Sequence, residues 1–150
     1  MKLELKNIKH TAWASEETHC YQASLYVDGK PVATVSNDGH GGADRYYDHP
    51  KCVYSGRSAW CDKMQEVHEY FKSLPHTHGM EQCLEFWCAD QVNDWLSARE
   101  LKKNLKKSYV YHFADGAGMF AHKLRPASTV AVVLNDMPFA DALAIWKETA

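Results

Sequence analysis

The segment Cys20–Ser36 reads Cys-Tyr-Gln-Ala-Ser-Leu-Tyr-Val-Asp-Gly-Lys-Pro-Val-Ala-Thr-Val-Ser and predicts a β-hairpin. Its apolar residues recur at every second position, which places them on one face of each strand. Those positions are Ala23, Leu25 and Val27 on the first strand and Ala33 and Val35 on the second. The dipeptide Asp28-Gly29 favours a tight turn between them, because that turn needs positive φ angles, which glycine adopts without steric cost. We therefore expect an antiparallel sheet in the first third of the chain.

The same patterns predict the elements that lie outside the hairpin. Leu3 and Leu5 alternate with charged residues, which indicates a first strand. Apolar residues at spacings of three and four predict a helix over residues 58–74 that ends before Pro75, and a second helix starts near residue 84. The segment Ser97-Ala-Arg-Glu100 has the pattern of a capping box, so we expect a separate short helix to begin there.

The last third of the chain predicts a second hairpin and a final helix. Residues 109–113 and 119–122 flank a glycine-rich turn at 115–118, and the apolar run 129–134 predicts a buried strand. Asp136 and Pro138 are suited to the start of the final helix. This order of elements predicts the α+β class: antiparallel β-hairpin units plus a further strand packed against three to four helices, as one domain over residues 1–150.

Composition and charge exclude some classes of function. The chain has 150 residues, 45% of them apolar, and 17 Lys and Arg against 19 Asp and Glu. A net charge of −2 favours neither general nucleic-acid binding nor the acidic surface of a DNA mimic. Five cysteines, an odd number, are typical of reduced thiols in the cytoplasm. Because no apolar run is long enough for a signal peptide or a membrane span, we expect a cytoplasmic protein that does not bind membranes.

The loop Asn37-Asp-Gly-His-Gly-Gly42 is the most distinctive motif, and two interpretations of it stay open. Its glycines can expose backbone N–H groups to an anion while His40 acts as an acid or base. Alternatively, asparagine, aspartate and glycine simply build a tight turn. We expect residues 37–54 to be irregular. The candidate binding residues in this region are Asn37, Asp38, His40, Asp44, Tyr46 and Tyr47.

A second candidate surface is the basic segment 99–107. Its cations can hold a phosphate backbone, and tyrosines on the following strand can stack on bases. The alternative is a solvated helix face whose lysines complement the helix dipole. The candidate binding residues of this segment are Arg99, Lys102, Lys103, Lys106 and Lys107.

Nothing in the sequence predicts a catalytic residue, a cofactor or a metal. Signatures of serine, cysteine and zinc hydrolases are missing. Cys83 and Cys88 are five residues apart, which on a helix points them in different directions and disfavours a zinc site. A metalloprotein or hydrolase centred on His40, His49 and Cys52 stays open as an alternative, because the fold can bring distant residues together.

Several segments resemble a group of small proteins encoded by bacteriophages and prophages. They are Lys6-Asn-Ile-Lys9, Ala14-Ser-Glu-Glu-Thr18, Ser36-Asn-Asp-Gly-His-Gly-Gly42 and the tail Leu134-Asn-Asp-Met-Pro-Phe-Ala-Asp-Ala-Leu-Ala-Ile-Trp146. The resemblance implies an accessory protein made in a bacterial cytoplasm, and it implies no catalytic residue.

Three hypotheses of function follow, in order of preference. The first is a non-enzymatic phage or prophage accessory protein that binds a host macromolecule, with a host protein as the expected partner and inhibition of a bacterial defence system as one form of this role. The second is a nucleic-acid or nucleotide-binding protein that uses loop 37–42 and basic helix 99–107. The third is the metalloprotein or hydrolase. The oligomeric state is not predicted.

Overall fold

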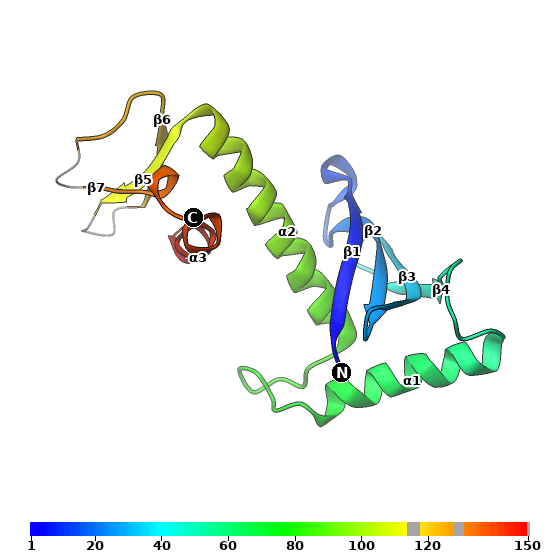
Figure 1. Cartoon of the computed structure of the whole chain (residues 1–150). Coiled ribbons are helices and arrows are strands. Elements are labelled where there is room, and N and C mark those ends of the chain that lie inside the picture. The colour runs from blue at the N-terminus through cyan, green and yellow to red at the C-terminus, as the bar shows by residue number, and fades with distance from the viewer. Residues whose placement is uncertain (114–117, 128–130, 150) are drawn as a thin grey trace. The chain divides into compact units, whose positions relative to one another are not determined.

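The structure, a computed structural model, describes residues 1–113, 118–127 and 131–149. Among these residues it contains a four-stranded and a three-stranded antiparallel sheet and three α-helices, so the predicted α+β class is confirmed (Figure 1). The chain divides into two compact units, Met1–Val92 and Asn93–Ala150, which we call unit 1 and unit 2. The single domain over residues 1–150 stays a prediction.

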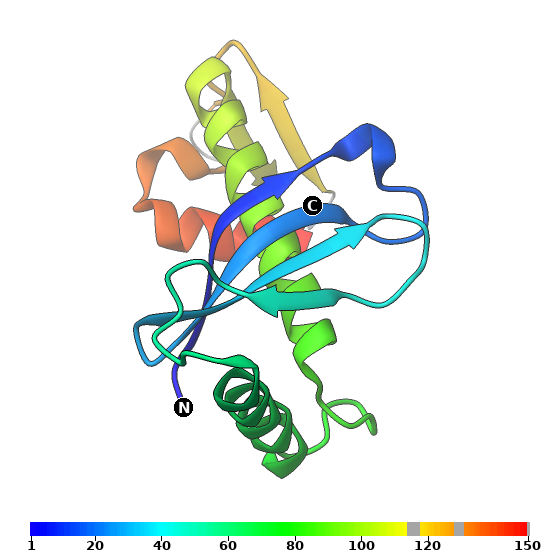
Figure 2. The same ribbon diagram turned by 90° about the vertical axis from the view of Figure 1, so that its right-hand side faces the viewer.

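Unit 1 contains a sheet of order β1-β2-β3-β4, whose strands lie side by side in Figure 2. The strands span Leu3–His10, Cys20–Val27, Lys30–Asp38 and Arg45–Asp48. The predicted hairpin is confirmed, since Leu25 pairs with Ala33 and Ala23 with Val35. Both turn residues have positive φ, 48° at Asp28 and 79° at Gly29, as the Asp-Gly turn requires. The apolar face of this hairpin is buried.

Strand β4 corrects the prediction of an irregular segment 37–54. Ser36 pairs with Arg45 and Ala33 with Asp48, so the chain leaves β3 in a short loop and returns beside it. Neighbouring side chains on a strand point to opposite faces of the sheet. Tyr46 therefore packs edge-on against His68 of a helix, with ring centroids 6.1 Å apart, while Tyr47 is 55% exposed. The two tyrosines do not form one surface patch.

Helix α1 spans Arg57–Ser73 and belongs to unit 1. Helix α2 spans Leu84–Lys107, and its first part, up to Val92, also belongs to unit 1. The predicted stripe of α1 is inward-facing, with Met64, Val67 and Phe71 buried. Trp60 Nε1 donates a hydrogen bond to the carbonyl oxygen of Val32 at 3.0 Å, which ties α1 to β3. The first turn of α2 is capped by Cys83, whose Sγ accepts a hydrogen bond from the Phe86 N–H at 3.5 Å.

The predicted helix start at Ser97 is wrong, because α2 continues without a break from Leu84 to Lys107. A capping-box pattern stabilises a helix start only where the preceding residues are not helical. Here the residues before Ser97 already belong to a helix whose buried positions include Leu84, Cys88 and Val92. The basic segment is therefore the C-terminal part of α2.

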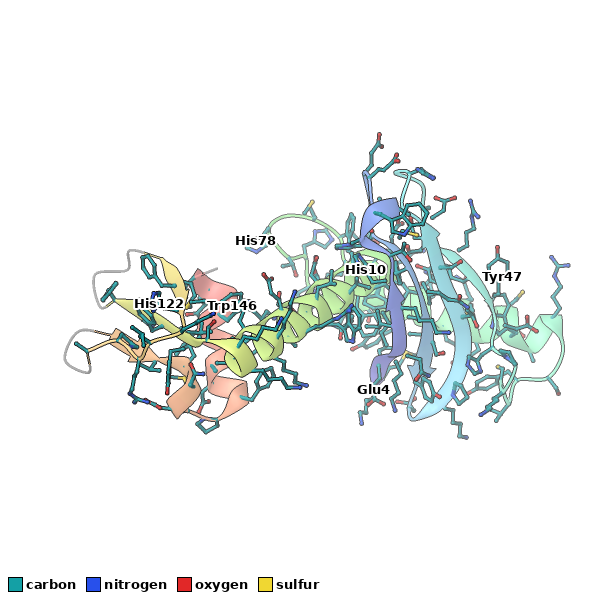
Figure 3. All side chains as sticks on the ribbon, turned by 90° about the horizontal axis from the view of Figure 1, so that it is seen from above. Glu4, His10, Tyr47, His78, His122 and Trp146 are labelled. Carbon is teal, nitrogen blue, oxygen red and sulfur yellow. The ribbon has the colours of Figure 1, made fainter. Side chains whose placement is uncertain are left out.

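Unit 2 contains the rest of α2, a sheet of order β6-β5-β7, and helix α3, Phe139–Thr149. Strands β5, β6 and β7 span Tyr109–Phe113, Met119–His122 and Ala131–Val133. The buried core comprises Leu101, Val110, Leu134, Ala142 and Trp146. Trp146 of α3 and His122 of β6 are labelled in Figure 3. The second predicted hairpin is confirmed, but most of its turn and residues 129–130 of the predicted strand lie outside the described residues.

The continuity of α2 makes the effect of Ser97→Ala predictable. If Ser97 capped a separate helix, the substitution would lower the free energy of unfolding by about 1 kcal/mol. Inside a continuous helix, we expect no loss and a gain of up to about 0.5 kcal/mol, because alanine has the higher helix propensity. Urea denaturation followed by circular dichroism distinguishes the two, and a loss near 1 kcal/mol would contradict a continuous α2.

Candidate functional site

The loop after β3 is organised around the side chain of Asn37. Its Oδ1 accepts hydrogen bonds from Thr18 Oγ1 at 2.8 Å and from the Gly39 N–H at 2.9 Å. Its Nδ2 donates to the Gly42 carbonyl oxygen at 2.9 Å and to Asp44 Oδ1 at 3.0 Å. Asn37 is the one buried polar residue among the described side chains. A buried amide needs such partners. All four hydrogen bonds are made within the protein, so the side chain of Asn37 holds the loop closed.

Asp44 is held in the same way and is not free to act as a base. Tyr21 donates a hydrogen bond to Asp44 Oδ2 at 2.6 Å, while Asp44 Oδ1 accepts from Asn37. Burial raises the pKa of the Tyr21 hydroxyl well above its usual range, and the neighbouring Cys88 and Asp44 add to the rise. Burial also raises the pKa of the Cys88 thiol. Both groups are neutral at pH 7, so neither is an activated nucleophile.

Two of the three loop glycines, Gly39 and Gly41, have N–H groups directed at side chains of the protein itself. The Gly39 N–H is bonded to Asn37, and the Gly41 N–H lies 3.3 Å from Thr18 Oγ1. The Gly39 carbonyl oxygen accepts from the N–H groups of Glu16 and Glu17 at 3.1 and 3.0 Å. These contacts support the structural interpretation of the motif, in which the loop anchors the connection between β1 and β2.

The exposed candidates of this region lie in two separate polar pairs, of which the one between Arg45 and Asp38 is an ion pair. His40 Nδ1 lies 3.2 Å from Glu16 Oε2, and Arg45 donates to Asp38 Oδ2 at 2.9 Å. All four side chains are about half exposed or more. Exposed pairs of this kind contribute about 1 kcal/mol or less to stability. They mark the polar surface at this end of the sheet.

Trp13 is a surface residue that the sequence patterns did not single out. It lies in a short 3₁₀ helix, Ala12–Ala14, between β1 and β2, and it is 87% exposed. The only signal in the sequence is a lone tryptophan between two alanines in a segment with neither strand nor helix periodicity. The loop 39–42 lies beside it, because Gly39 bonds to Glu16 and Glu17 of the same connection.

The structure does not bring His40 together with His49 and Cys52, although His49 and Cys52 share one turn, in which the Cys52 N–H donates to the His49 carbonyl oxygen at 2.8 Å. His40 follows β3, whereas His49 follows β4 and bonds through its N–H to the carbonyl oxygen of Val32 near the start of β3. His40 and His49 therefore lie at opposite ends of β4. Among the residues that the structure describes, no three His, Cys, Asp or Glu side chains are placed to hold a metal ion.

The basic candidates lie in unit 2, on one face of α2. Arg99 lies over the ring of Trp95, 5.3 Å from its centroid, and Lys102 lies over the ring of Phe139 at 5.1 Å. Lys103, Lys106 and Lys107 are exposed. Loop 37–42 belongs to unit 1, so the two parts of the nucleic-acid hypothesis are carried by different units.

Three hollows are lined by other residues than His40, Asp38 and Asp44. One of about 370 Å³ lies beside the start of α2, lined by Met80, Phe86, Trp87 and their neighbours. One of about 450 Å³ runs along the basic face of α2. A small one of about 100 Å³ lies on β1 and β2. None of these three gathers the acid–base candidates.

Because the loop is closed, substitutions of two of its glycines should have very different effects on stability. Gly39 has a φ of +87°, and a Cβ added there would overlap the Ala14 carbonyl oxygen, whereas a Cβ on Gly42 would meet nothing. We expect Gly39→Ala to lower the free energy of unfolding by about 2 kcal/mol or more, and Gly42→Ala to change it by about 0.5 kcal/mol or less. Equal denaturation midpoints for the two variants would contradict the closed loop.

The half-buried Tyr46 predicts a loss of stability at high pH. Burial raises the pKa of Tyr46 well above its usual range, so the folded state keeps a proton that the unfolded state loses above about pH 10. This stability is complete below that pH and falls as the pH rises. Tyr46→Phe should reduce the slope of unfolding free energy against pH, above pH 10, by at most about 1.4 kcal/mol per pH unit.

The exposed Tyr47→Phe is the matched control for this measurement. Urea denaturation of both variants and the wild type between pH 7 and pH 11 gives the slopes. Equal changes of the slope in Tyr46→Phe and Tyr47→Phe would contradict the more buried position of Tyr46.

Among the described residues, Trp13 in unit 1 and the basic segment of α2 in unit 2 are both exposed. None of the described helices is both long and apolar enough to cross a membrane. No family model, no curated protein and no solved structure matches this chain.

Proposed function

We propose that this chain is a non-enzymatic binding protein and that unit 1 recognises a partner protein through the surface around Trp13. The observation that supports this proposal is the 87% exposure of a tryptophan on an otherwise ordered connection. An indole buries roughly 150–250 Å² when it enters a partner's pocket. At about 25 cal/mol per Å², that burial contributes roughly 4–6 kcal/mol. Tryptophan is also among the residues most enriched at binding hot spots.

The base that carries Trp13 is held by hydrogen bonds on both sides. Ser15 Oγ donates to the Thr11 carbonyl oxygen at 2.8 Å and accepts from the Cys20 N–H at 2.9 Å. The Thr11 N–H donates to the Cys20 carbonyl oxygen at 2.9 Å. Because this segment is already ordered, binding costs less conformational entropy than it would for a flexible loop.

The surroundings of Trp13 suit a protein interface. Glu16, three residues after Trp13, forms an exposed polar pair with His40, and Asp38 and Arg45 form a second exposed pair. A central aromatic anchor with a polar rim is the usual arrangement of an interface. The candidate residues Asp38 and His40 thus belong to the rim in this proposal.

A binding role is favoured over catalysis by the state of the polar side chains. Asn37 and Tyr21 each donate a hydrogen bond to Asp44, so none of the three is poised for acid–base chemistry. His40 lies on the surface beside Glu16. This arrangement supports a stoichiometric binder.

The resemblance to phage and prophage proteins supplies the context of the proposal. The partner is a protein of the bacterial host, encountered in the cytoplasm, and a component of a defence system is the class of partner that we name. Inhibition in this proposal results from occupying the partner's surface.

The proposal is tested by capture and then by a measured affinity. Tagged wild-type protein is incubated with nuclease-treated bacterial lysate, and captured proteins are identified by mass spectrometry. One host protein is expected at near-equal stoichiometry. With that protein purified, Trp13→Ala should raise the dissociation constant by about 30-fold or more. This corresponds to the loss of a hot spot of about 2 kcal/mol.

Met80→Ala is the matched control, because Met80 is also an apolar side chain of unit 1 and is 60% exposed. It should bind like the wild type. Retention of the partner by Trp13→Ala at full affinity would contradict the proposal, as would a host lysate from which no protein is recovered at near-equal stoichiometry.

A further inference from the structure

The two units carry opposite net charges. Unit 1 has nine Lys and Arg against 13 Asp and Glu, a net charge of −4, whereas unit 2 has eight against six, a net charge of +2. Five of the eight cations of unit 2 lie in residues 99–107. The near-neutral total of the chain therefore conceals a basic surface, and charge asymmetry of this kind is typical of nucleic-acid contact.

Helix geometry places these five cations on one side of α2. Residues three and four apart are neighbours on a helix surface, so Arg99, Lys102, Lys103, Lys106 and Lys107 form a continuous stripe, about 12 Å long for nine residues. The opposite side of the helix holds Leu101, which is fully buried in the core of unit 2. We call the stripe, together with Trp95 at its N-terminal end, the α2 basic face.

The α2 basic face has no acidic partner within the described part of the chain. The ion pairs of unit 2 join Arg125 to Asp136 and Lys147 to Asp94, and none involves residues 99–107. Lysines in the last turn complement the helix dipole, which accounts for Lys106 and Lys107. It does not account for Arg99, Lys102 and Lys103, because the dipole effect is confined to the last turn.

The shape of the face suits a polymer lying across it. The hollow of about 450 Å³ is lined by residues of α2 alone: Trp95, Ala98, Arg99, Lys102, Lys103, Lys106 and Lys107. A single helix does not enclose a small molecule, so this hollow is a shallow depression between side chains. Arg99 lies against the Trp95 ring at 5.3 Å, which adds an aromatic group to the cations.

We propose that the α2 basic face binds the phosphate backbone of a nucleic acid. Duplex DNA carries one charge per about 1.7 Å of its axis, so a 12 Å face spans about seven phosphate charges, which suits five cations. An acidic protein is the less favoured occupant, because lysine is depleted at protein–protein interfaces and this face has only Trp95 as a large apolar group. This site lies in unit 2 and is independent of the Trp13 surface.

The test compares two charge-matched triple variants of the full chain. Lys103→Gln, Lys106→Gln and Lys107→Gln together remove three cations from the face. Lys9→Gln, Lys30→Gln and Lys51→Gln remove three exposed lysines from unit 1. Fluorescence anisotropy with a labelled 20-base-pair DNA duplex, and with the corresponding 20-nucleotide single strand, gives affinities between 50 and 200 mM NaCl.

We expect the wild type to bind with a slope of log K against log salt of about −4 to −5 on the duplex, since each phosphate contact contributes about −0.9. The α2 variant should lose at least about tenfold in affinity at 50 mM salt, and its slope should fall by about 3 in magnitude. The unit 1 variant should stay within about twofold of the wild type. Circular dichroism confirms that both variants are folded.

Several outcomes would overturn the proposal. They are no binding of either DNA at 50 mM salt, equal losses in the two variants, and an unchanged salt slope in the α2 variant. Binding to heparin without binding to DNA would also overturn it, because the face would then select another polyanion. Loss of binding to both the duplex and the single strand in the α2 variant alone would support a contact to the backbone.

Discussion

The arrangement of unit 1 depends on the hydrogen bonds of the buried side-chain amide of Asn37. Its four hydrogen bonds connect the end of β3 to Thr18, to its own loop and to Asp44. A buried amide left without partners would cost about 1–3 kcal/mol. Satisfying it closes loop 39–42, and Gly39 of that loop then bonds to the segment that carries Trp13. The hydrogen bonds of Asn37 are thus linked, through Gly39, to the backbone of the segment that carries Trp13.

The two units present chemically different surfaces. The surface around Trp13 is an apolar anchor with a polar rim, whereas the α2 basic face is nearly all cationic. Burial of apolar area stabilises a complex of the first surface with a protein. Counterion release stabilises a complex of the second surface with a phosphate backbone.

Local patterns predicted the elements well where the chain's own periodicity and turn chemistry dominate. The hairpin around Asp28-Gly29 and the buried stripe of α1 were both correct. The strand β4 was missed, because Arg45–Asp48 has no alternation of apolar and polar residues and becomes a strand by pairing with β3. The break at Ser97 was wrongly predicted. A capping pattern does not start a new helix where the backbone hydrogen bonds of an existing helix are intact.

By itself the sequence determined the α+β class, the main hairpin and the concentration of cations in residues 99–107. These depend on residue type and spacing within a few positions of one another. Only the tertiary structure decided that Asn37 and Asp44 are bonded inward, that Tyr46 and Tyr47 face opposite ways, and that Trp13 is exposed. Those outcomes depend on contacts between distant segments, such as Thr18 with Asn37 and Tyr46 with His68. Residue spacing along the chain carries no record of such contacts, because folding alone brings these side chains together.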